Sequence, residues 1–157
     1  MNGPSHGEVK WVNGEPILVE VGSRCHGSEG LWIPVADAVM HCNQVAASAA
    51  AYLSREAFLE VPSLPVERFA DGRLLFLVSR VQGILKAVDA VLVEEIRQMA
   101  SFVRMELFVK PGARIVPTIN CFTFGGVVVL INEHSPQLEK DYQRIHEMEE
   151  SGLFEVE

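Results

Sequence analysis

The stretch that most constrains how this chain folds runs from Glu8 to Gly27 and reads E-V-K-W-V-N-G-E-P-I-L-V-E-V-G-S-R-C-H-G. Apolar and polar side chains alternate along it, which predicts two β-strands joined by a turn, because successive side chains of a strand point to opposite faces. A loop flanked by glycines follows and carries Arg24 and His26. The sequence therefore predicts a β-hairpin with a polar loop at the end of its second strand.

The apolar side chains form one row on each strand, and we expect both rows to face one core; they are Val9 and Trp11, then Ile17, Val19 and Val21. Side chains directly opposite each other in an antiparallel pair point to the same side. Pairing Trp11 with Ile17 therefore places Glu8 opposite Glu20 on the outer face. The sequence thus predicts two facing carboxylates.

The turn of the hairpin affects this pairing. A tight two-residue turn at Asn13-Gly14 would pair Glu8 with Val19 and mix the two faces. Pro16 has no N–H for the strand ladder, which is compatible with irregular pairing near the turn. We therefore expect a wider loop or a bulge within residues 12–16, which would keep the two glutamates opposite each other.

Facing carboxylates repel, so a cation is expected between them. One interpretation is a solvated face on which Lys10 partly neutralises the pair, and the other is a divalent metal ion. Arg24, four residues after Glu20, also has two interpretations: a salt bridge to Glu20, or an oxyanion-binding group beside a magnesium ion. The residues alone leave these alternatives open.

Composition limits the kinds of partner. The chain has 157 residues, 48% of them hydrophobic, which suits one domain or a large part of one. A net charge of -8 argues against binding nucleic acid or an anionic membrane through bulk electrostatics. Three cysteines without framework spacing, and an N-terminal stretch without the pattern of a signal peptide, favour a cytoplasmic protein.

Beyond the hairpin, the pattern predicts an α+β fold, mainly antiparallel sheet with packed helices. Residues 1–60 would hold the hairpin, its loop and helices, including one capped by Asn43 in which Ala46 to Ala51 pack into a core. Residues 61–157 would form an α+β subdomain. Its expected strands cover 74–81, 84–88, 101–109 and 127–131, and its expected helices run over 89–99, capped by Asp89, and from a capping Ser135 before Pro136 to Ser151-Gly152.

Other chemical candidates are weaker. Cys25-His26 and His41-Cys42 supply thiols and imidazoles of the kind that zinc sites use, but neighbouring residues on an extended chain point in opposite directions and the usual spacer is missing. Cys25 as a nucleophile activated by His26 is similarly weak, because residues adjacent in the sequence do not have the geometry that a nucleophile and its base require. His6 shares the strand face of Glu8 if the strand reaches it, where it would orient Glu8, contact a substrate, or simply be exposed.

These residues resemble a known family. The segment G-P-S-H-G-E-V-K-W-V-N-G-E-P-I-L-V-E-V-G-S-R-C-H-G looks like the metal-binding end of ATP-grasp carboxylate-amine ligases, in which a glutamate on one strand is followed by a strand reading Glu-x-Asn-x-Arg and a glycine-containing loop. The similarity continues to the closing D-Y-Q-R-I-H-E-M-E-E-S-G-L-F and covers nearly the whole chain. It implies the C-terminal portion of an ATP-grasp fold, with residues 1–60 as its metal-binding part.

The resemblance also implies roles for particular residues. Glu8 matches the first metal-ligating acid, Glu20 the acid that bridges two magnesium ions, and Arg24 the arginine near the transferred phosphoryl group, which makes it the candidate catalytic residue. Gly22 stands where the third ligand, usually asparagine, is found. The loop on the substrate side would comprise His26, Gly27 and Ser28.

The implied reaction joins a carboxylate to an amine through an acyl phosphate, with ATP, Mg²⁺ and the two small molecules as ligands. In the family, the nucleotide-binding portion precedes the position of Glu8. We therefore expect this chain to be the C-terminal portion of a ligase, incomplete and inactive alone, whose partner is a missing N-terminal ATP-grasp portion. The alternative is a non-catalytic binding or regulatory domain that retains the fold but has lost the chemistry. The absence of a ligand side chain at Gly22 would be the first sign of that loss.

Overall fold

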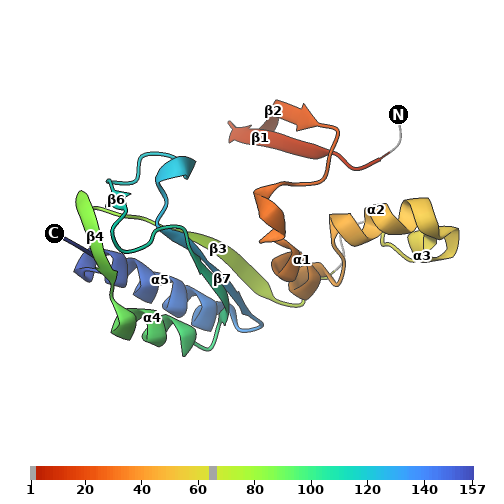
Figure 1. Cartoon of the computed structure of the whole chain (residues 1–157). Coiled ribbons are helices and arrows are strands. Elements are labelled where there is room, and N and C mark those ends of the chain that lie inside the picture. Colours follow the sequence, from red (N-terminus) through yellow and green to blue (C-terminus); the bar gives the residue numbers. More distant parts are fainter. Residues whose placement is uncertain (1–2, 64–66) are drawn as a thin grey trace. The chain divides into compact units, whose positions relative to one another are not determined.

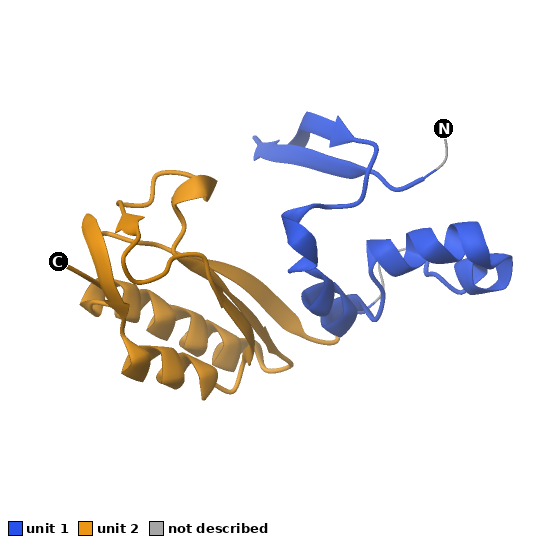
Figure 2. Cartoon of the chain, in the orientation of Figure 1, with its two compact units in different colours: residues 1–67 blue, residues 68–157 orange. Residues whose placement is uncertain are grey.

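The computed structural model describes residues 3–63 and 67–157. The chain forms two units, residues 1–67 and residues 68–157 (Figure 2). The first contains a two-stranded hairpin followed by helices, and the second contains two three-stranded sheets and two α-helices, one of them long (Figure 1). All strand pairs are antiparallel among the described residues, so the predicted α+β class with antiparallel sheets and packed helices is confirmed.

The hairpin consists of β1 (His6–Val12) and β2 (Glu15–Gly22), and its turn is tight. Asn13 and Gly14 form it with φ angles of 51° and 85°, the left-handed values that a two-residue type I′ turn requires. The expected wider loop within 12–16 is therefore wrong. The irregularity lies instead between Glu8 and Val9, where β2 contributes one extra residue. This bulge restores the predicted pairing of Glu8 with Glu20.

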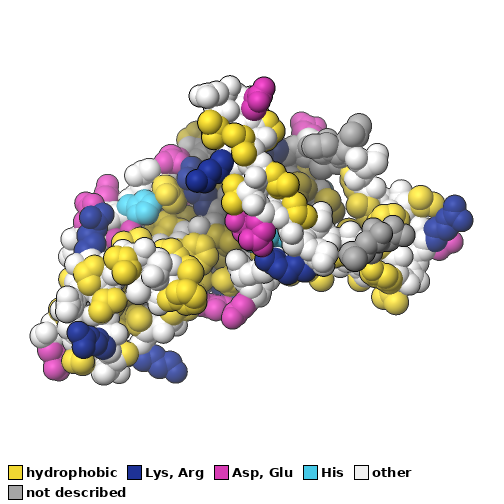
Figure 3. Space-filling model, turned by 90° about the horizontal axis from the view of Figure 1, so that it is seen from above, with side chains coloured by type: hydrophobic (Ala, Val, Ile, Leu, Met, Phe, Trp, Pro, Cys, Tyr) yellow, Lys and Arg dark blue, Asp and Glu magenta, His cyan; other side chains and the backbone are white. Residues whose placement is uncertain are grey.

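The apolar residues of the hairpin are exposed, which contradicts the prediction that both rows face a core. The tight turn pairs Val9 with Leu18 and moves Ile17 to the other face, opposite Lys10. The face that carries Val9, Trp11, Leu18 and Val21 is covered by none of the described residues, and Trp11 is 72% exposed. Figure 3 shows hydrophobic side chains at the surface beside acidic and basic ones.

Short helices follow the hairpin: η1 (Ser28–Gly30), α1 (Ile33–Met40), α2 (Gln44–Leu53) and α3 (Arg55–Leu59). The predicted cap of α2 is confirmed, because the Asn43 side chain accepts a 2.8 Å hydrogen bond from the N–H of Ala46. The predicted core packing of Ala46 to Ala51 is wrong, since α2 has no buried residue. The sequence did not predict α3, which Ser54 caps.

In the second unit, β7 (Gly126–Asn132) lies between β3 (Asp71–Leu77) and β5 (Phe102–Leu107). Its residues Val127 to Leu130 are fully buried, as the unbroken apolar run predicts. Gly126 allows close strand packing, because a Cβ atom there would lie 2.5 Å from the carbonyl oxygen of Glu106. The first strand of this unit was predicted over 74–81, but it begins at Asp71 and ends at Leu77.

The other sheet places β4 (Gly83–Val88) between β6 (Arg114–Ile115) and β8 (Phe154–Val156). The sequence did not predict β8. A short helix, η2 (Cys121–Thr123), precedes β7 and is closed by reciprocal hydrogen bonds between Asn120 and Thr123. β4 therefore belongs to a different sheet from β3, although the two strands are neighbours in the sequence.

Two helices, α4 (Ala90–Arg97) and α5 (Ser135–Ser151), complete this unit. Asp89 caps α4, as predicted. The predicted capping role of Ser135 is wrong: His134 is the N-cap residue of α5, and the Ser135 hydroxyl donates to Asp71 instead. The core beneath these helices is apolar and includes Leu77, Leu85, Ile96, Ile145 and Met148. No helix in the described ranges is long and apolar enough to cross a membrane.

Buried and paired carboxylates connect α5 to its surroundings. Glu149 is 7% exposed and accepts 2.7 Å hydrogen bonds from the N–H of Val78 and from Nδ1 of His146. On the exposed side, Arg144 donates through Nε and Nη2 to both oxygens of Glu95, at 2.7 and 3.2 Å. This guanidinium lowers the pKa of the Glu95 carboxyl group.

Candidate functional site

Two carboxylates face each other on the polar side of the hairpin. Glu8 and Glu20 are directly opposite residues of β1 and β2, so their side chains project from the same face. His6 and Gly22 form a second opposite pair, two residues further along each strand and therefore on that face as well. Both glutamates are exposed. The face accordingly presents two acidic side chains beside an imidazole and a position without a side chain.

Arg24 lies against the empty position left by Gly22. A Cβ atom at residue 22 would lie 3.5 Å from Cγ of Arg24, 3.6 Å from Nε and 3.8 Å from Cζ. Because a side chain at residue 22 would point to the face of Glu20, the Arg24 side chain lies on the carboxylate face. Its Nη1 donates to the carbonyl oxygen of Cys25 at 3.0 Å, and within the described part of the chain it forms no salt bridge with Glu20.

The loop after β2 folds back onto β1 through its histidine. The rings of His26 and His6 are 4.7 Å apart between centroids, with an interplanar angle of 35°. The indole of Trp32 meets His26 edge-on at 5.6 Å and donates through Nε1 to the carbonyl oxygen of Gly27 at 2.8 Å. Nδ1 of His26 is buried without a hydrogen-bond partner among the described residues. The imidazole of His26 is thus fixed beside the carboxylate face.

The other two loop residues predicted to face the substrate, Gly27 and Ser28, are exposed. Ser28 and Glu29 have φ angles of 57° and 51°, and two successive non-glycine residues in the left-handed region are unusual. Strained backbone of this kind clusters at functional sites in proteins. The loop therefore presents exposed polar groups on a backbone that its surroundings hold in a sparsely populated conformation.

Gln44, which sequence reasoning missed, connects this loop to the start of the hairpin. Its Oε1 accepts from the N–H of His26 at 2.8 Å, and its Nε2 donates to the carbonyl oxygen of Ser5 at 2.7 Å. These partners are 18 and 39 residues away in the sequence. No local sequence signal marks such a side chain, because both of its partners are backbone groups.

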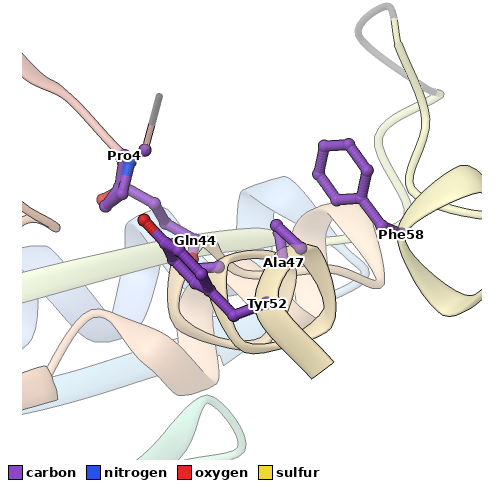
Figure 4. Close-up of a pocket in the computed structure, with 8 residues that line it drawn as sticks. Pro4, Gln44, Ala47, Tyr52 and Phe58 are labelled. Atoms are coloured by element: carbon purple, nitrogen blue, oxygen red, sulfur yellow. The ribbon is translucent and has the colours of Figure 1, made fainter. Parts of the chain in front are cut away.

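Gln44 also lines a cavity in the first unit, about 740 Å³ in volume. Figure 4 shows Gln44 and Tyr52 pointing from α2 toward Pro4, with Ala47 and Phe58 further along the cavity. None of the described residues that line the cavity has a charged side chain. The Gln44 amide thus stands between an uncharged cavity and the loop that bears Arg24 and His26.

The donor set of the hairpin fits a magnesium ion in part. Carboxylate oxygens are the hard ligands that magnesium prefers, and the ion usually completes its shell with waters and substrate phosphates. The described residues contain no group of three or more histidine, cysteine, aspartate or glutamate side chains arranged to hold a metal ion. Glu8 and Glu20 would therefore be the protein's contribution, with no side-chain oxygen at Gly22.

Two solved ligases share this fold. The L-amino acid ligase from Bacillus licheniformis superimposes with a TM-score of 0.74 at 20% identity, covering 92% of this chain and 36% of the ligase. The phosphoribosylglycinamide synthetase from Anaerococcus prevotii gives a TM-score of 0.64 at 14% identity, covering 91% of this chain and 35% of that enzyme. The chain has a partial ATP-grasp fold. It spans about a third of the length of the ATP-grasp ligases it matches.

At these identities the similarity is one of fold. No family model and no curated protein matches the sequence. The predicted ATP-grasp resemblance is confirmed at the level of structure. The assignments of Glu8 and Glu20 to metal, of Arg24 to catalysis, and of His26, Gly27 and Ser28 to substrate remain predictions.

Proposed function

We propose that this chain is the C-terminal portion of an ATP- and magnesium-dependent ligase that joins a carboxylate to an amine. The observation that supports this most directly is the pairing of Glu8 with Glu20 on one face of a hairpin, in a chain with a partial ATP-grasp fold. The side chain of Arg24 lies on the same face. Acidic oxygens and a guanidinium side by side suit a metal-bound phosphate.

In the proposed reaction, an oxygen of the substrate carboxylate attacks the γ-phosphorus of ATP, and the bond to ADP breaks. The amine nitrogen then attacks the acyl carbon, inorganic phosphate leaves, and the nitrogen loses a proton to give the amide. Bound magnesium would supply positive charge to the phosphoryl oxygens. Glu8 and Glu20 would hold the ion, and Arg24 would donate hydrogen bonds to the transferred phosphoryl group.

The loop residues would act on the substrate side. His26 is fixed against His6, and Gly27 and Ser28 expose polar groups next to it. The nucleotide would be held by an N-terminal ATP-grasp portion as partner, since the chain spans about a third of the ligases it matches. We propose accordingly that the 157 residues alone form no ADP from ATP. Magnesium-dependent ADP formation by the purified chain would contradict this.

Metal binding tests the proposal. We expect Glu8→Gln and Glu20→Gln each to weaken binding of Mn²⁺, titrated in place of Mg²⁺, by at least about tenfold, since even groups outside the first coordination shell typically contribute that much. Glu15→Gln is the matched control: it removes the same charge from β2, but at the residue opposite Val12 beside the turn. Equal Mn²⁺ affinity in the wild-type and Glu20→Gln chains would reject the metal site.

A second candidate function is a non-catalytic binding or regulatory domain that keeps the fold. Gly22 favours this function. In the ligases that the chain resembles, this position carries a metal ligand, whereas here it has no side chain and the cationic side chain of Arg24 lies next to it. Under this hypothesis, anions would bind near Arg24 without any dependence on Mn²⁺. The titrations of the glutamate variants therefore discriminate between the two functions.

A further inference from the structure

We propose that Gln44 is a positioning residue that holds the Arg24–His26 loop in place over the carboxylate face. Its side-chain amide makes two hydrogen bonds at once, accepting from His26 and donating to Ser5 at 2.8 and 2.7 Å. Its backbone carbonyl oxygen accepts from the Ser48 hydroxyl at 2.6 Å and lies 3.9 Å from the Cys25 thiol. Four contacts therefore converge on the first residue of α2.

The two backbone partners flank the site from both sides. Ser5 directly precedes β1, so the hydrogen bond to its carbonyl group holds the backbone just before His6, the first residue of that strand. His26 follows Arg24 by two residues, so its N–H fixes the loop that carries the guanidinium. The start of β1 and the loop are therefore joined twice. The rings of His6 and His26 contact each other with centroids 4.7 Å apart, and the amide of Gln44 bridges the backbone of Ser5 and His26.

The chemistry of this connection requires an amide. One partner is a donor and the other an acceptor, and a side-chain amide offers an acceptor oxygen beside a donor nitrogen. A carboxylate at residue 44 would keep the bond from His26 but would place a negative oxygen against the Ser5 carbonyl group. A thioether would satisfy neither partner. The substitutions Gln44→Glu and Gln44→Met therefore separate the two hydrogen bonds.

The arrangement divides the candidate site into two parts. Glu8 and Glu20 are held opposite each other by the backbone ladder of the hairpin, which does not involve Gln44. The loop with Arg24 and His26 lies beyond the ladder, and Gln44 holds its backbone through the N–H of His26, in addition to the ring contacts of His26 with His6 and Trp32. Gln44 therefore sets the geometry of the anion-binding part and leaves the metal-binding part unchanged. This division rests on the proposed function, whereas the positioning of the loop does not.

The test uses amide hydrogen exchange of His26, measured by NMR in the full chain. Gln44→Met should accelerate this exchange roughly 2- to 10-fold, the range expected for one hydrogen bond. Gln44→Glu should retain wild-type exchange at His26. Gln143→Met is the control, because the Gln143 amide bonds within α5, to Glu139 at 2.7 Å. Wild-type exchange at His26 in Gln44→Met would overturn the positioning role.

Ligand titrations test the functional division. Gln44→Met should weaken binding of pyrophosphate at saturating Mg²⁺ while binding of Mn²⁺ alone stays at the wild-type level. An equal loss of Mn²⁺ and pyrophosphate binding would overturn the division, because Gln44 would then support the whole hairpin. Mn²⁺ titration of Glu20→Gln tests the proposed metal site separately. If that site is rejected, the amide exchange of His26 in Gln44→Met still tests the positioning role of Gln44.

Discussion

Gly22 is the residue at which this chain departs from the ligase pattern it resembles, and its surroundings show what the missing side chain changes. It lies opposite His6 and on the same face as the two glutamates. The space above it is taken by the Arg24 side chain, 3.5 Å from the Cβ position at its nearest atom. That distance is ordinary van der Waals contact, and a flexible arginine can yield to a new neighbour.

We therefore expect Gly22→Asn to strengthen divalent metal binding. The asparagine amide would add a hard oxygen ligand on the face of Glu20, and the backbone at residue 22 is outside the left-handed region that would strain a side chain. The gain should be at least about tenfold in Mn²⁺ affinity, the contribution expected even of groups outside the first shell. Isothermal titration with Mn²⁺ measures it.

Gly7→Asn is the matched control for this substitution. Gly7 pairs with Val21 on the opposite face of the same hairpin, and a Cβ atom there meets nothing within 4 Å. The control should therefore leave Mn²⁺ affinity unchanged. If both variants bind Mn²⁺ as the wild-type chain does, Gly22 does not mark a ligand position.

At the scale of secondary-structure elements, Glu149 joins α5 to the end of β3. The carboxylate is buried and accepts from the N–H of Val78, just beyond the last residue of that strand. A buried carboxylate is retained at low cost only when its hydrogen bonds are satisfied, and here His146 provides the second one at 2.7 Å. This contact helps to end β3 at Leu77.

Glu149→Leu should lower the free energy of unfolding by roughly 1–3 kcal/mol, because the partly buried N–H of Val78 then loses its hydrogen-bond partner. Glu149→Gln keeps an acceptor oxygen for Val78 and should lower it less. Urea unfolding followed by circular dichroism gives both values. Glu150→Leu removes the neighbouring exposed carboxylate, paired with Arg80, and should change little. A loss as large in Glu150→Leu would show that burial is not the cause.

Elements whose signals are local could be predicted from the sequence. Asn43 and Asp89 cap the helices they were expected to cap, and the run after Gly125-Gly126 forms the buried central strand β7. Pairing between distant segments could not be predicted in the same way. The pairing of β8 with β4 joins residues far apart in the sequence, such as Phe154 and Val88, and nothing in the three residues of β8 indicates its partner.

The sequence also predicted part of the candidate site from a local signal, but it did not predict the details of strand pairing. Alternation along the hairpin identified Glu8 opposite Glu20, yet the turn was tight and a bulge at Glu8/Val9 compensated for it. A bulge leaves little trace in a pattern of alternating residues. Burial of the hairpin was also mispredicted, because apolar spacing indicates which residues share a face but not whether anything covers that face.

At the scale of the whole molecule, one face of the hairpin is apolar and exposed to solvent. Val9, Trp11, Leu18 and Val21 form an apolar surface that none of the described residues covers. Exposed apolar patches on a two-stranded sheet promote association between molecules. We therefore expect the chain to self-associate through this surface.

Trp11→Thr should reduce that association without a cost in stability. Threonine is favoured in strands, and a side chain that is 72% exposed contributes little to folding, so the free energy of unfolding should stay within about 0.5 kcal/mol of the wild-type value. Sedimentation velocity at increasing protein concentration measures the association. Ile17→Thr, on the other face of β2, is the control and should leave association as it is.

If Ile17→Thr reduces association as strongly as Trp11→Thr does, the surface responsible is not the face defined by Val9 and Trp11. A marked loss of stability in Trp11→Thr alone would mean that the indole packs against the protein in solution.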